Sequence, residues 1–483
     1  MKLPSAFTLM TLCGAYAAFY FLAIPVLVDA DVVWHIAAGD RIMATGHVPT
    51  ENGWAFTEPQ QPWYLISWLW NLLLHGLHDM GGLATIFIAS VLCMTVVAGF
   101  LAHRIDMHKR IGSEAKLLTI FVACLGLVEF VSGRPHVGGY LLVVVTHLIL
   151  HSSRDEKSRR LLFVLPLLFA AWANIHGSFI AGFTLLFAYC AEALLTRNRP
   201  WLKALAAALL ACVAALWVNP YGGGLFTGVF GTLGSQHLAT ITEWGHFVFG
   251  ESLGLSMWLL IFVIAWISRD KTAPLADRII SLGWLAACMF SFRNAGIFIL
   301  VSAPYMAMNL QSMLTRLEHI RTHRPDPLAF VGNPRMQQKL ALVLVVLMVA
   351  GSALLPLIRG ERWRADKQSD PGPAVAYVLE HLKGRRVLND YDYGGRIIYE
   401  SAGTFPVFID PRFGTAYSET LIQDYLTFLL HYHRWEDVIA KHRIDAILIS
   451  NHSIFAQEYL AGHYHKHWQQ VYKDEVAGVY VRK

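Results

Sequence analysis

Long apolar segments recur along most of this chain, separated by short polar loops. The first begins near Ser5 and exceeds 20 residues, which is long enough to cross a bilayer as a helix. It has little basic sequence before it and is longer than the apolar core of a signal peptide, so we expect a retained helix. Only 15% of the residues are charged, whereas about a quarter is usual in soluble domains. The sequence therefore predicts a polytopic α-helical membrane protein.

The apolar runs predict about eleven transmembrane helices. We place them at residues 6–28, 82–103, 117–132, 137–151, 161–174, 178–195, 201–218, 253–268, 279–291, 295–312 and 340–358. Residues 1–358 would thus form a transmembrane domain, and residues 359–483 a soluble α/β domain.

Lysine and arginine collect in alternate loops, at 104–116, 154–160, 197–203, 269–278 and 316–339, whereas the opposite loops hold only Arg41, Arg134 and Arg293. Loops rich in Lys and Arg face the cytoplasm, so the N-terminus is expected there. The first loop, 29–80, and the tail would face outward. This distribution accounts for the net charge of +5 without nucleic-acid binding.

The long first loop contains the Trp-rich segment 61–82, which predicts an amphipathic helix lying at the outer interface, with Trp63, Trp68 and Trp70 at headgroup depth. In the tail, residues 372–383 and 419–444 have helical periodicity. Residues 385–390, 405–410 and 445–450 predict strands, 391–400 and 408–414 predict strand ends around a glycine turn, and 469–483 predicts a closing hairpin.

Polar residues gather in the loops that are expected to face outward. They are Asp29, Asp31, His35 and Asp40; Arg134 and His136; Asn174 and His176; Asn219 and Tyr221; Glu243 and His246; Arg293 and Asn294. Ionisable groups at the ends of transmembrane helices are costly and usually face a cavity. Their common depth predicts one polar cavity near the outer surface.

Each cluster also has a structural explanation. Asp29 could cap the helix that Asp31 begins, and His35 could be a packed histidine. The pair of Asp31 and His35, four residues apart, shares one helix face whatever its role. Arg134 and Arg293 could bind lipid headgroups.

Two further motifs have structural explanations of the same kind. Asn219 and Tyr221 could belong to a helix-terminating turn. His176, next to a glycine, could mark a tight helix contact, and Asp410 with Arg412 could be an ion pair at a strand end.

The chemistry that suits the outward clusters is transfer at a phosphate-bearing lipid. Asp31 could deprotonate an acceptor or hold a metal ion. Arg134 and Arg293 suit a phosphate or diphosphate, which guanidinium groups bind through two hydrogen bonds. The chain contains no serine-nucleophile elbow, P-loop or HExxH motif.

These features resemble the GT-C superfamily of membrane glycosyltransferases, which use polyprenyl-phosphate sugars. More narrowly, the chain resembles a bacterial group with an Asp-x-Asp first loop. The matching motifs are Asp29, Asp31, Trp34, His35 and Gly39; Pro62-Trp63 and Trp68-Leu69; RPH at 134–136; NIHGS at 174–178; NPYG at 219–222; EW at 243–244; NDYDYGG at 389–395; and FIDPR at 408–412. The group has a glutamate before the Trp-Leu pair, where this chain has Ser67, so a second acid would have to come from elsewhere, such as Glu58 or Glu243.

The resemblance implies a glycosyltransferase that moves a sugar or short glycan from a polyprenyl-linked (di)phosphate to a glycan, lipid or protein acceptor at the periplasmic face of the inner membrane. Asp31, helped by Asp29, would be catalytic. The expected substrate-binding residues are His35, Arg134, His136, Asn174, His176, Asn219, Tyr221, Glu243, Arg293, Asp392, Asp410 and Arg412. A divalent cation, Mg²⁺ or Mn²⁺, could be held by Asp31 and Glu243.

The alternatives are a non-enzymatic transporter of a polyprenyl lipid or polysaccharide, and a membrane scaffold that recruits an acceptor. A transporter should carry polar residues near the middle of the membrane. Here the main residues of that kind are Glu129 and His147, each expected near one end of its span. This placement favours the enzyme.

Overall fold

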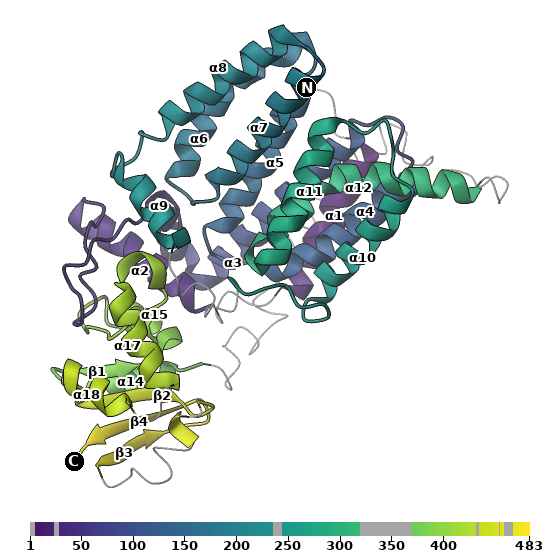
Figure 1. Cartoon of the computed structure of the whole chain (residues 1–483). Helices are drawn as coiled ribbons and strands as arrows, with labels where there is room; N and C mark the ends of the chain where they lie inside the picture. The colour runs from purple at the N-terminus through teal and green to yellow at the C-terminus, as the bar shows by residue number, and fades with distance from the viewer. Residues whose placement is uncertain are drawn as a thin grey trace. The chain divides into compact units, whose positions relative to one another are not determined.

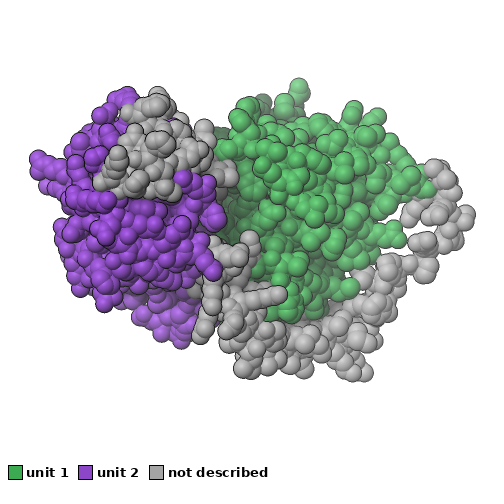
Figure 2. Space-filling view, turned by 90° about the horizontal axis from the view of Figure 1, so that it is seen from below, with its two compact units in different colours: residues 1–24, 87–222, 240–358 green, residues 25–86, 223–239, 359–483 purple. Residues whose placement is uncertain are grey.

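The computed structural model describes residues 5–23, 29–234, 244–318, 370–430, 434–453, 455–457 and 467–483. The predicted helix at 340–358 lies outside these residues, as does Glu243. The chain forms two compact units (Figure 2). Unit 1 comprises Met1–Ile24, Phe87–Gly222 and Thr240–Ile358, and unit 2 comprises Pro25–Ile86, Gly223–Ala239 and Arg359–Lys483. The first loop and the tail therefore belong to the same unit.

Unit 1 is a helical bundle (Figure 1). Its helices are α1 (Ala6–Leu22), the second part of α3 (Trp68–Asp106), α4 (Ser113–Leu127), α5 (His136–Ser152), α6 (Leu165–Ala173), α7 (Phe179–Leu195), α8 (Arg199–Ala215), α10 (Leu253–Ile267), α11 (Leu275–Phe290) and α12 (Ala295–Glu318). Short 3₁₀ turns lie at Val128–Phe130, Glu156–Val164 and Phe292–Asn294. Each predicted span from 82–103 to 295–312 coincides with one of these helices over much of its length.

Side-chain caps and glycines set several helix boundaries. Ser5 accepts a hydrogen bond from Thr8 N, and Ser252 accepts one from Leu255 N, each at 3.2 Å, which satisfies amides that a helix start leaves unpaired. Helix α3 is broken at Gly81 and Gly82, and Gly82 has φ of 68°, a conformation that glycine adopts without steric cost. The break separates the expected loop helix from the expected span at 82–103.

Two described helices meet the length and composition of a membrane span, Trp68–Asp106 and Phe292–Leu317, and the other apolar helices have 10–17 residues. The predicted count of eleven spans is thus not confirmed.

Unit 2 combines helices with a small sheet (Figure 1). Its helices are α2 (Ala30–Thr45), the first part of α3, α9 (Gly224–Gly234), α14 (Gly372–His381), α15 (Tyr391–Glu400), α16 (Phe413–Ala416), α17 (Glu419–Leu430) and α18 (Trp435–His442). The strands β1 (Val387–Asn389), β2 (Ala446–Ser450), β3 (Trp468–Lys473) and β4 (Ala477–Arg482) are ordered β1-β2-β4-β3. Strands β1 and β2 are parallel and the other pairs antiparallel.

The tail follows its predicted pattern with two exceptions. Residues 391–400 form helix α15 rather than a strand end, because Tyr393, Ile397 and Ile398 repeat at helical spacing and are buried together. Residues 405–410 do not join the sheet. Their backbone instead meets the first loop, where Phe56 N donates to Val407 O at 3.0 Å and Val407 N donates to Trp54 O at 2.9 Å.

Candidate functional site

The two acids of the first loop lie at the start of α2. Asp29 is its N-cap residue and accepts a hydrogen bond from Asp31 N at 3.0 Å, so the capping explanation of Asp29 is correct. Asp31 lies in the first turn, and its Oδ1 accepts a hydrogen bond from the indole Nε1 of Trp34 at 3.3 Å. Both acids are partly exposed, as a catalytic or ligand-binding carboxylate requires.

His35, predicted to bind substrate, is packed inside unit 2. It is 5% exposed, and its Nδ1 donates to Asn71 Oδ1 at 2.8 Å, because that amide oxygen can only accept. The packed-histidine alternative therefore describes this side chain. Sequence reasoning missed Asn71, although an asparagine within the apolar stretch of α3 was a signal that it has a buried partner.

The tail motifs pack directly on the first-loop motif. A Cβ placed on Gly395 of α15 would lie 2.6 Å from the carbonyl oxygen of Ala30, at the start of α2. Only glycine permits so close an approach. Asp392, in the first turn of the same helix, is exposed, so it remains accessible to an acceptor or sugar.

Asp410 and Arg412 form an ion pair in the core of unit 2. Both side chains are 0% exposed, and Arg412 Nη2 lies 2.6 Å from Asp410 Oδ2. Arg412 also donates to Asn52 Oδ1 at 2.6 Å and lies over the rings of Trp54 and Trp63, 4.7 and 4.4 Å from their centroids. The expectation that this pair contacts substrate is therefore corrected, because no part of either side chain reaches the surface.

Burial is the largest single effect on Arg412 and disfavours its charged form, but the Asp410 carboxylate and Tyr417 together outweigh it and raise the pKa of Arg412 above its ordinary value. Arg412 is thus a cation enclosed by two indoles, an amide and a carboxylate. Sequence reasoning missed its partners Asn52 and Trp54, which lie in an irregular loop without periodicity.

The expectation that the loop tryptophans lie at headgroup depth is wrong for two of them. Trp63 is 1% exposed and Trp70 is 8% exposed, so neither is available at the headgroups. Glu58, considered as a second acid, accepts hydrogen bonds from the amide and hydroxyl of Ser418, the former at 2.9 Å. It helps to cap α17 rather than to extend the acidic pair.

Asp390, the N-cap residue of α15, has a perturbed acidity. Burial and the nearby Asp392 carboxylate raise the pKa of Asp390 from 3.8 to about 6. Between pH 4 and 6 the folded chain therefore keeps a proton that the unfolded chain releases, and the free energy of unfolding falls as pH rises.

We expect Asp390→Asn to remove this dependence. The wild type should lose up to roughly 3 kcal/mol of stability, relative to the variant, between pH 4 and 6. Denaturant titrations of the two chains across this range measure the difference. Asp437→Asn, at an exposed ion pair, is the control and should follow the wild type; a constant difference between D390N and wild type would contradict the prediction.

In unit 1, several predicted residues gather at one end of the bundle. His136 Nε2 donates to Phe130 O at 3.0 Å, and the Phe130 ring stacks on Phe292 with centroids 5.6 Å apart. A Cβ on Gly139 would lie 3.4 Å from Nδ1 of His176. The starts of α5, α7 and α12 thus meet. Half-buried Arg134 immediately precedes this cluster.

Arg293 follows α11 at the same end. It is exposed, and its guanidinium carbon lies 4.9 Å from the ring centroid of Trp244. Asn174 is buried and donates to Val218 O at 2.7 Å. Asn219 Oδ1 accepts from Tyr221 N at 2.8 Å, which is the helix-terminating turn considered above. Asn174 thus connects the end of α6 to the end of α8.

The acidic pair and His35 belong to unit 2, whereas Arg134, His136, His176 and Arg293 belong to unit 1. The single cavity that would unite them therefore remains a prediction.

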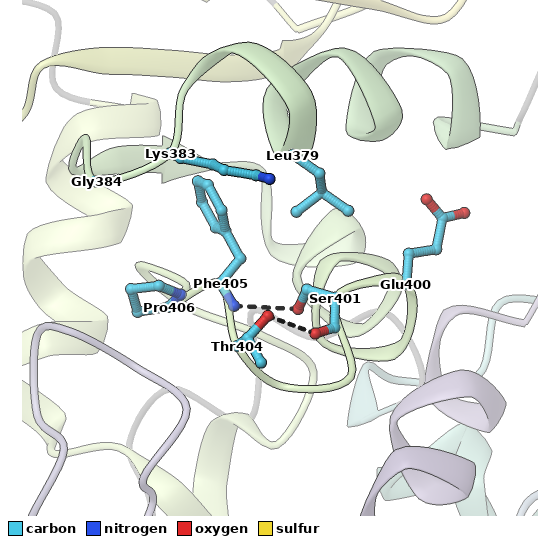
Figure 3. A pocket seen from close by; sticks show the side chains of 8 residues that line it. All are labelled: Leu379, Lys383, Gly384, Glu400, Ser401, Thr404, Phe405 and Pro406. Carbon is cyan, nitrogen blue, oxygen red and sulfur yellow. Dashed lines mark hydrogen bonds between the residues drawn. The ribbon is translucent and has the colours of Figure 1, made fainter.

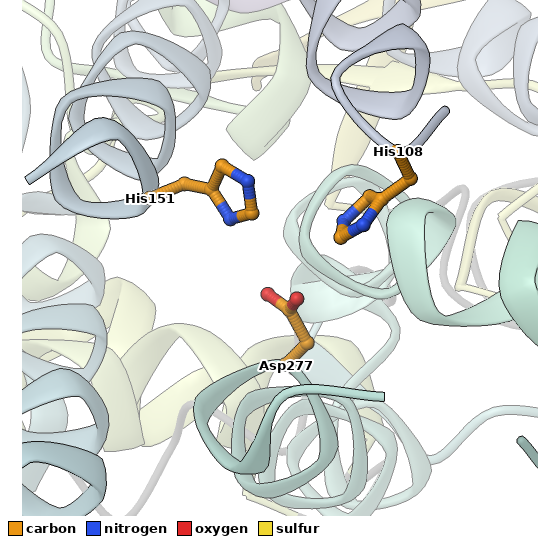
Figure 4. Close-up of side chains that lie close together, drawn as sticks. All are labelled: His108, His151 and Asp277. Atoms are coloured by element: carbon orange, nitrogen blue, oxygen red, sulfur yellow. The ribbon is translucent and has the colours of Figure 1, made fainter. Parts of the chain in front are cut away.

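A second polar cluster occupies the other end of unit 1. His108, His151 and Asp277 present ligand atoms within 4.8 Å of one another (Figure 4). Arg104 donates to both Asp277 oxygens, at 2.8 and 2.9 Å, and to His108 Nε2 at 2.8 Å. Arg154 donates to His151. Because two guanidinium groups already bind these three side chains, the cluster suits an ion-pair network better than a metal centre.

Unit 2 also has an open pocket of about 500 Å³ between the ends of α14 and α15 (Figure 3). Its hydroxyls are engaged within the turn: Thr404 donates to Ser401 O, and Ser401 accepts from Phe405 N at 3.2 Å. Glu400 pairs with Arg396. Most of the polar side chains that line the pocket therefore already have partners within the protein.

The arrangement of helices and sheet defines a known class of fold. No protein-family model and no curated protein sequence matches the chain. Among solved structures, it is similar to the oligosaccharyltransferase of Archaeoglobus fulgidus tethered to an acceptor peptide with an NVT sequon, with a TM-score of 0.57, 13% identity, and coverage of 92% of this chain and 69% of that one. The apo form of that enzyme gives a TM-score of 0.54 at 12% identity. The chain therefore has an oligosaccharyltransferase-like fold, mostly helical with a small C-terminal sheet.

Proposed function

We propose that this protein is a GT-C-type glycosyltransferase. It transfers a sugar or short glycan from a polyprenyl-linked phosphate or diphosphate to an acceptor at the periplasmic face of a bacterial inner membrane. The observation that carries the proposal is the fold together with a partly exposed acid, Asp31, at the start of α2. An archaeal enzyme of similar fold has been crystallised with an acceptor peptide.

A membrane setting is supported by the outer surface of unit 1. Large apolar side chains are more than half exposed on several of its helices, among them Phe121, Leu167, Phe187, Leu210, Val263 and Ile267. Exposed apolar surface of this extent suits lipid. The alternation of basic and non-basic loops supports an outward position for the first loop and the tail.

In the proposed reaction, the Asp31 carboxylate orients and deprotonates the acceptor nucleophile. Arg134 and Arg293 bind the leaving phosphate, whose negative charge grows as the glycosidic bond breaks. His136 and His176 line the donor side. Exposed Asp392 contacts the acceptor.

A divalent cation is compatible with the acidic pair. Asp29 accepts a hydrogen bond from Asp31 N, and Asp31 accepts one from Trp34 Nε1. Carboxylate oxygens are the ligands that Mg²⁺ and Mn²⁺ prefer. Such an ion would neutralise charge on the donor phosphate. Glu243, expected to assist, lies outside the described residues.

The donor site can be tested with undecaprenyl phosphate as the probe. We expect the purified chain to bind it and R134A/R293A to bind at least about ten-fold more weakly, since each guanidinium–phosphate contact contributes more than 1 kcal/mol. Native mass spectrometry with phosphatidylglycerol as competitor measures this. The double variant R160A/R199A, at the opposite loops, is the control.

Equal binding by all three proteins, or equal competition by phosphatidylglycerol, would contradict a dedicated donor site. Transfer of radiolabelled sugar from an extracted lipid-linked pool by the purified chain alone would separate an enzyme from a transporter or scaffold.

A further inference from the structure

Trp34 lies between the candidate catalytic acid and the tail. Its indole Nε1 donates to Asp31 Oδ1 at 3.3 Å, within one turn of α2. The side chain is 8% exposed, so the ring is packed while its N–H points to a partly exposed carboxylate. An indole N–H can only donate, and a carboxylate held by such a donor has fewer orientations to choose from.

The ring of Trp34 is fixed on three sides within unit 2. It stacks on His35 with centroids 3.6 Å apart, and His35 is tied to Asn71 of α3. It meets the edge of Trp63, with centroids 6.2 Å apart. A Cβ on Gly395 would lie 3.5 Å from Trp34 Cδ1, so α15 closes the third side.

Two of these three supports connect to the tail. Gly395 belongs to the tail itself, and Trp63 lies against the buried guanidinium of Arg412, 4.4 Å from the ring centroid. Contacts therefore run from Arg412 through Trp63 and Trp34 to Asp31 without a gap. A catalytic group performs best when neighbouring packing and hydrogen bonds fix its rotamer.

We propose that Trp34 is a positioning residue that holds the Asp31 carboxylate in its productive orientation, and that the tail fixes Trp34. The proposal rests on the role of Asp31 in the proposed transfer. Loss of the N–H should lower turnover and leave substrate affinity almost unchanged, because Trp34 is buried and orients the acid rather than the substrate.

The contact itself is tested by NMR on the full chain in detergent micelles, with ¹⁵N-labelled indoles. The Trp34 resonance is identified by its loss in W34F. We expect Asp31→Ala to move that N–H resonance upfield while Asp40→Ala, at an exposed acid of the same helix, leaves it in place. An identical Trp34 resonance in D31A and wild type would overturn the proposal.

The consequence is tested by kinetics. We expect W34F to lower kcat by about ten-fold or more with KM within about two-fold. Trp54→Phe, at a second buried indole that contacts Arg412, should change kcat far less. If D31N is inactive while W34F keeps full kcat, or loses no more than W54F, then Trp34 does not position Asp31. The proposed transfer reaction would be unaffected by that result. If D31N transfers at the wild-type rate, Asp31 has no catalytic role and the positioning proposal fails with it, whatever the NMR result; if the wild-type chain transfers no sugar, the proposed function fails.

Discussion

Replacing Asp31 with asparagine is expected to lower the transfer rate by about 10²–10⁴-fold, the contribution of a positioned general base. The change removes the negative charge and the basicity but keeps the shape and one oxygen that can accept from Trp34. Asp31 is partly exposed and its main-chain amide is already bound by Asp29, so little stability should be lost. Rates of transfer from a lipid-linked donor, measured beside thermal unfolding curves, check both statements.

Asp40→Asn is the matched control for this experiment. Asp40 lies on α2 as well, is 51% exposed, and pairs with His75 at 2.6 Å. It should retain most of the activity, because surface pairs of this kind contribute little. Wild-type transfer by D31N, or an equal loss in both variants, would remove Asp31 from the mechanism.

Periodicity determined how well the sequence predicted the fold. The apolar runs predicted the helices of unit 1, and strands β1, β2 and the β3–β4 hairpin followed from short alternating segments. Residues 391–400 were misassigned because two glycines suggested a turn, whereas Tyr393, Ile397 and Ile398 follow a helical face. Residues 405–410 have strand composition but pair with the first loop, and no local pattern encodes that choice of partner.

In the candidate site too, interactions between residues close in sequence could be predicted, whereas those between residues far apart could not. The cap at Asp29 is a local interaction and was anticipated. The burial of Arg412 between Trp54 and Trp63 joins residues about 350 positions apart, so a single sequence offers no sign of it. The Trp-rich loop was assigned to the membrane surface because tryptophan favours both interfaces and protein cores, and only the fold distinguishes them.

Substituting Arg412 with methionine should destabilise unit 2 by about 3–5 kcal/mol, the usual cost of leaving one member of a buried ion pair uncompensated. Methionine fills much of the same space between the two indoles, so the loss reports mainly the unpaired Asp410 and the unpaired Asn52 oxygen. Denaturant titrations of the full chain, followed by tryptophan fluorescence, measure the change. R434A, at an ion pair whose side chains are 74% and 72% exposed, should cost less than about 1 kcal/mol.

The double variant D410N/R412M separates charge from packing. Because it removes the buried carboxylate as well as its partner, it should recover part of the stability lost in R412M. A loss of less than about 1 kcal/mol in R412M would mean that water reaches Asp410, and that the tail does not depend on this pair. If instead the predicted loss is seen, the first loop should become sensitive to protease together with the tail, because Arg412 is bound by Asn52, Trp54 and Trp63 of that loop. The segment that carries the candidate acid and the segment expected to face the acceptor would then unfold as one body.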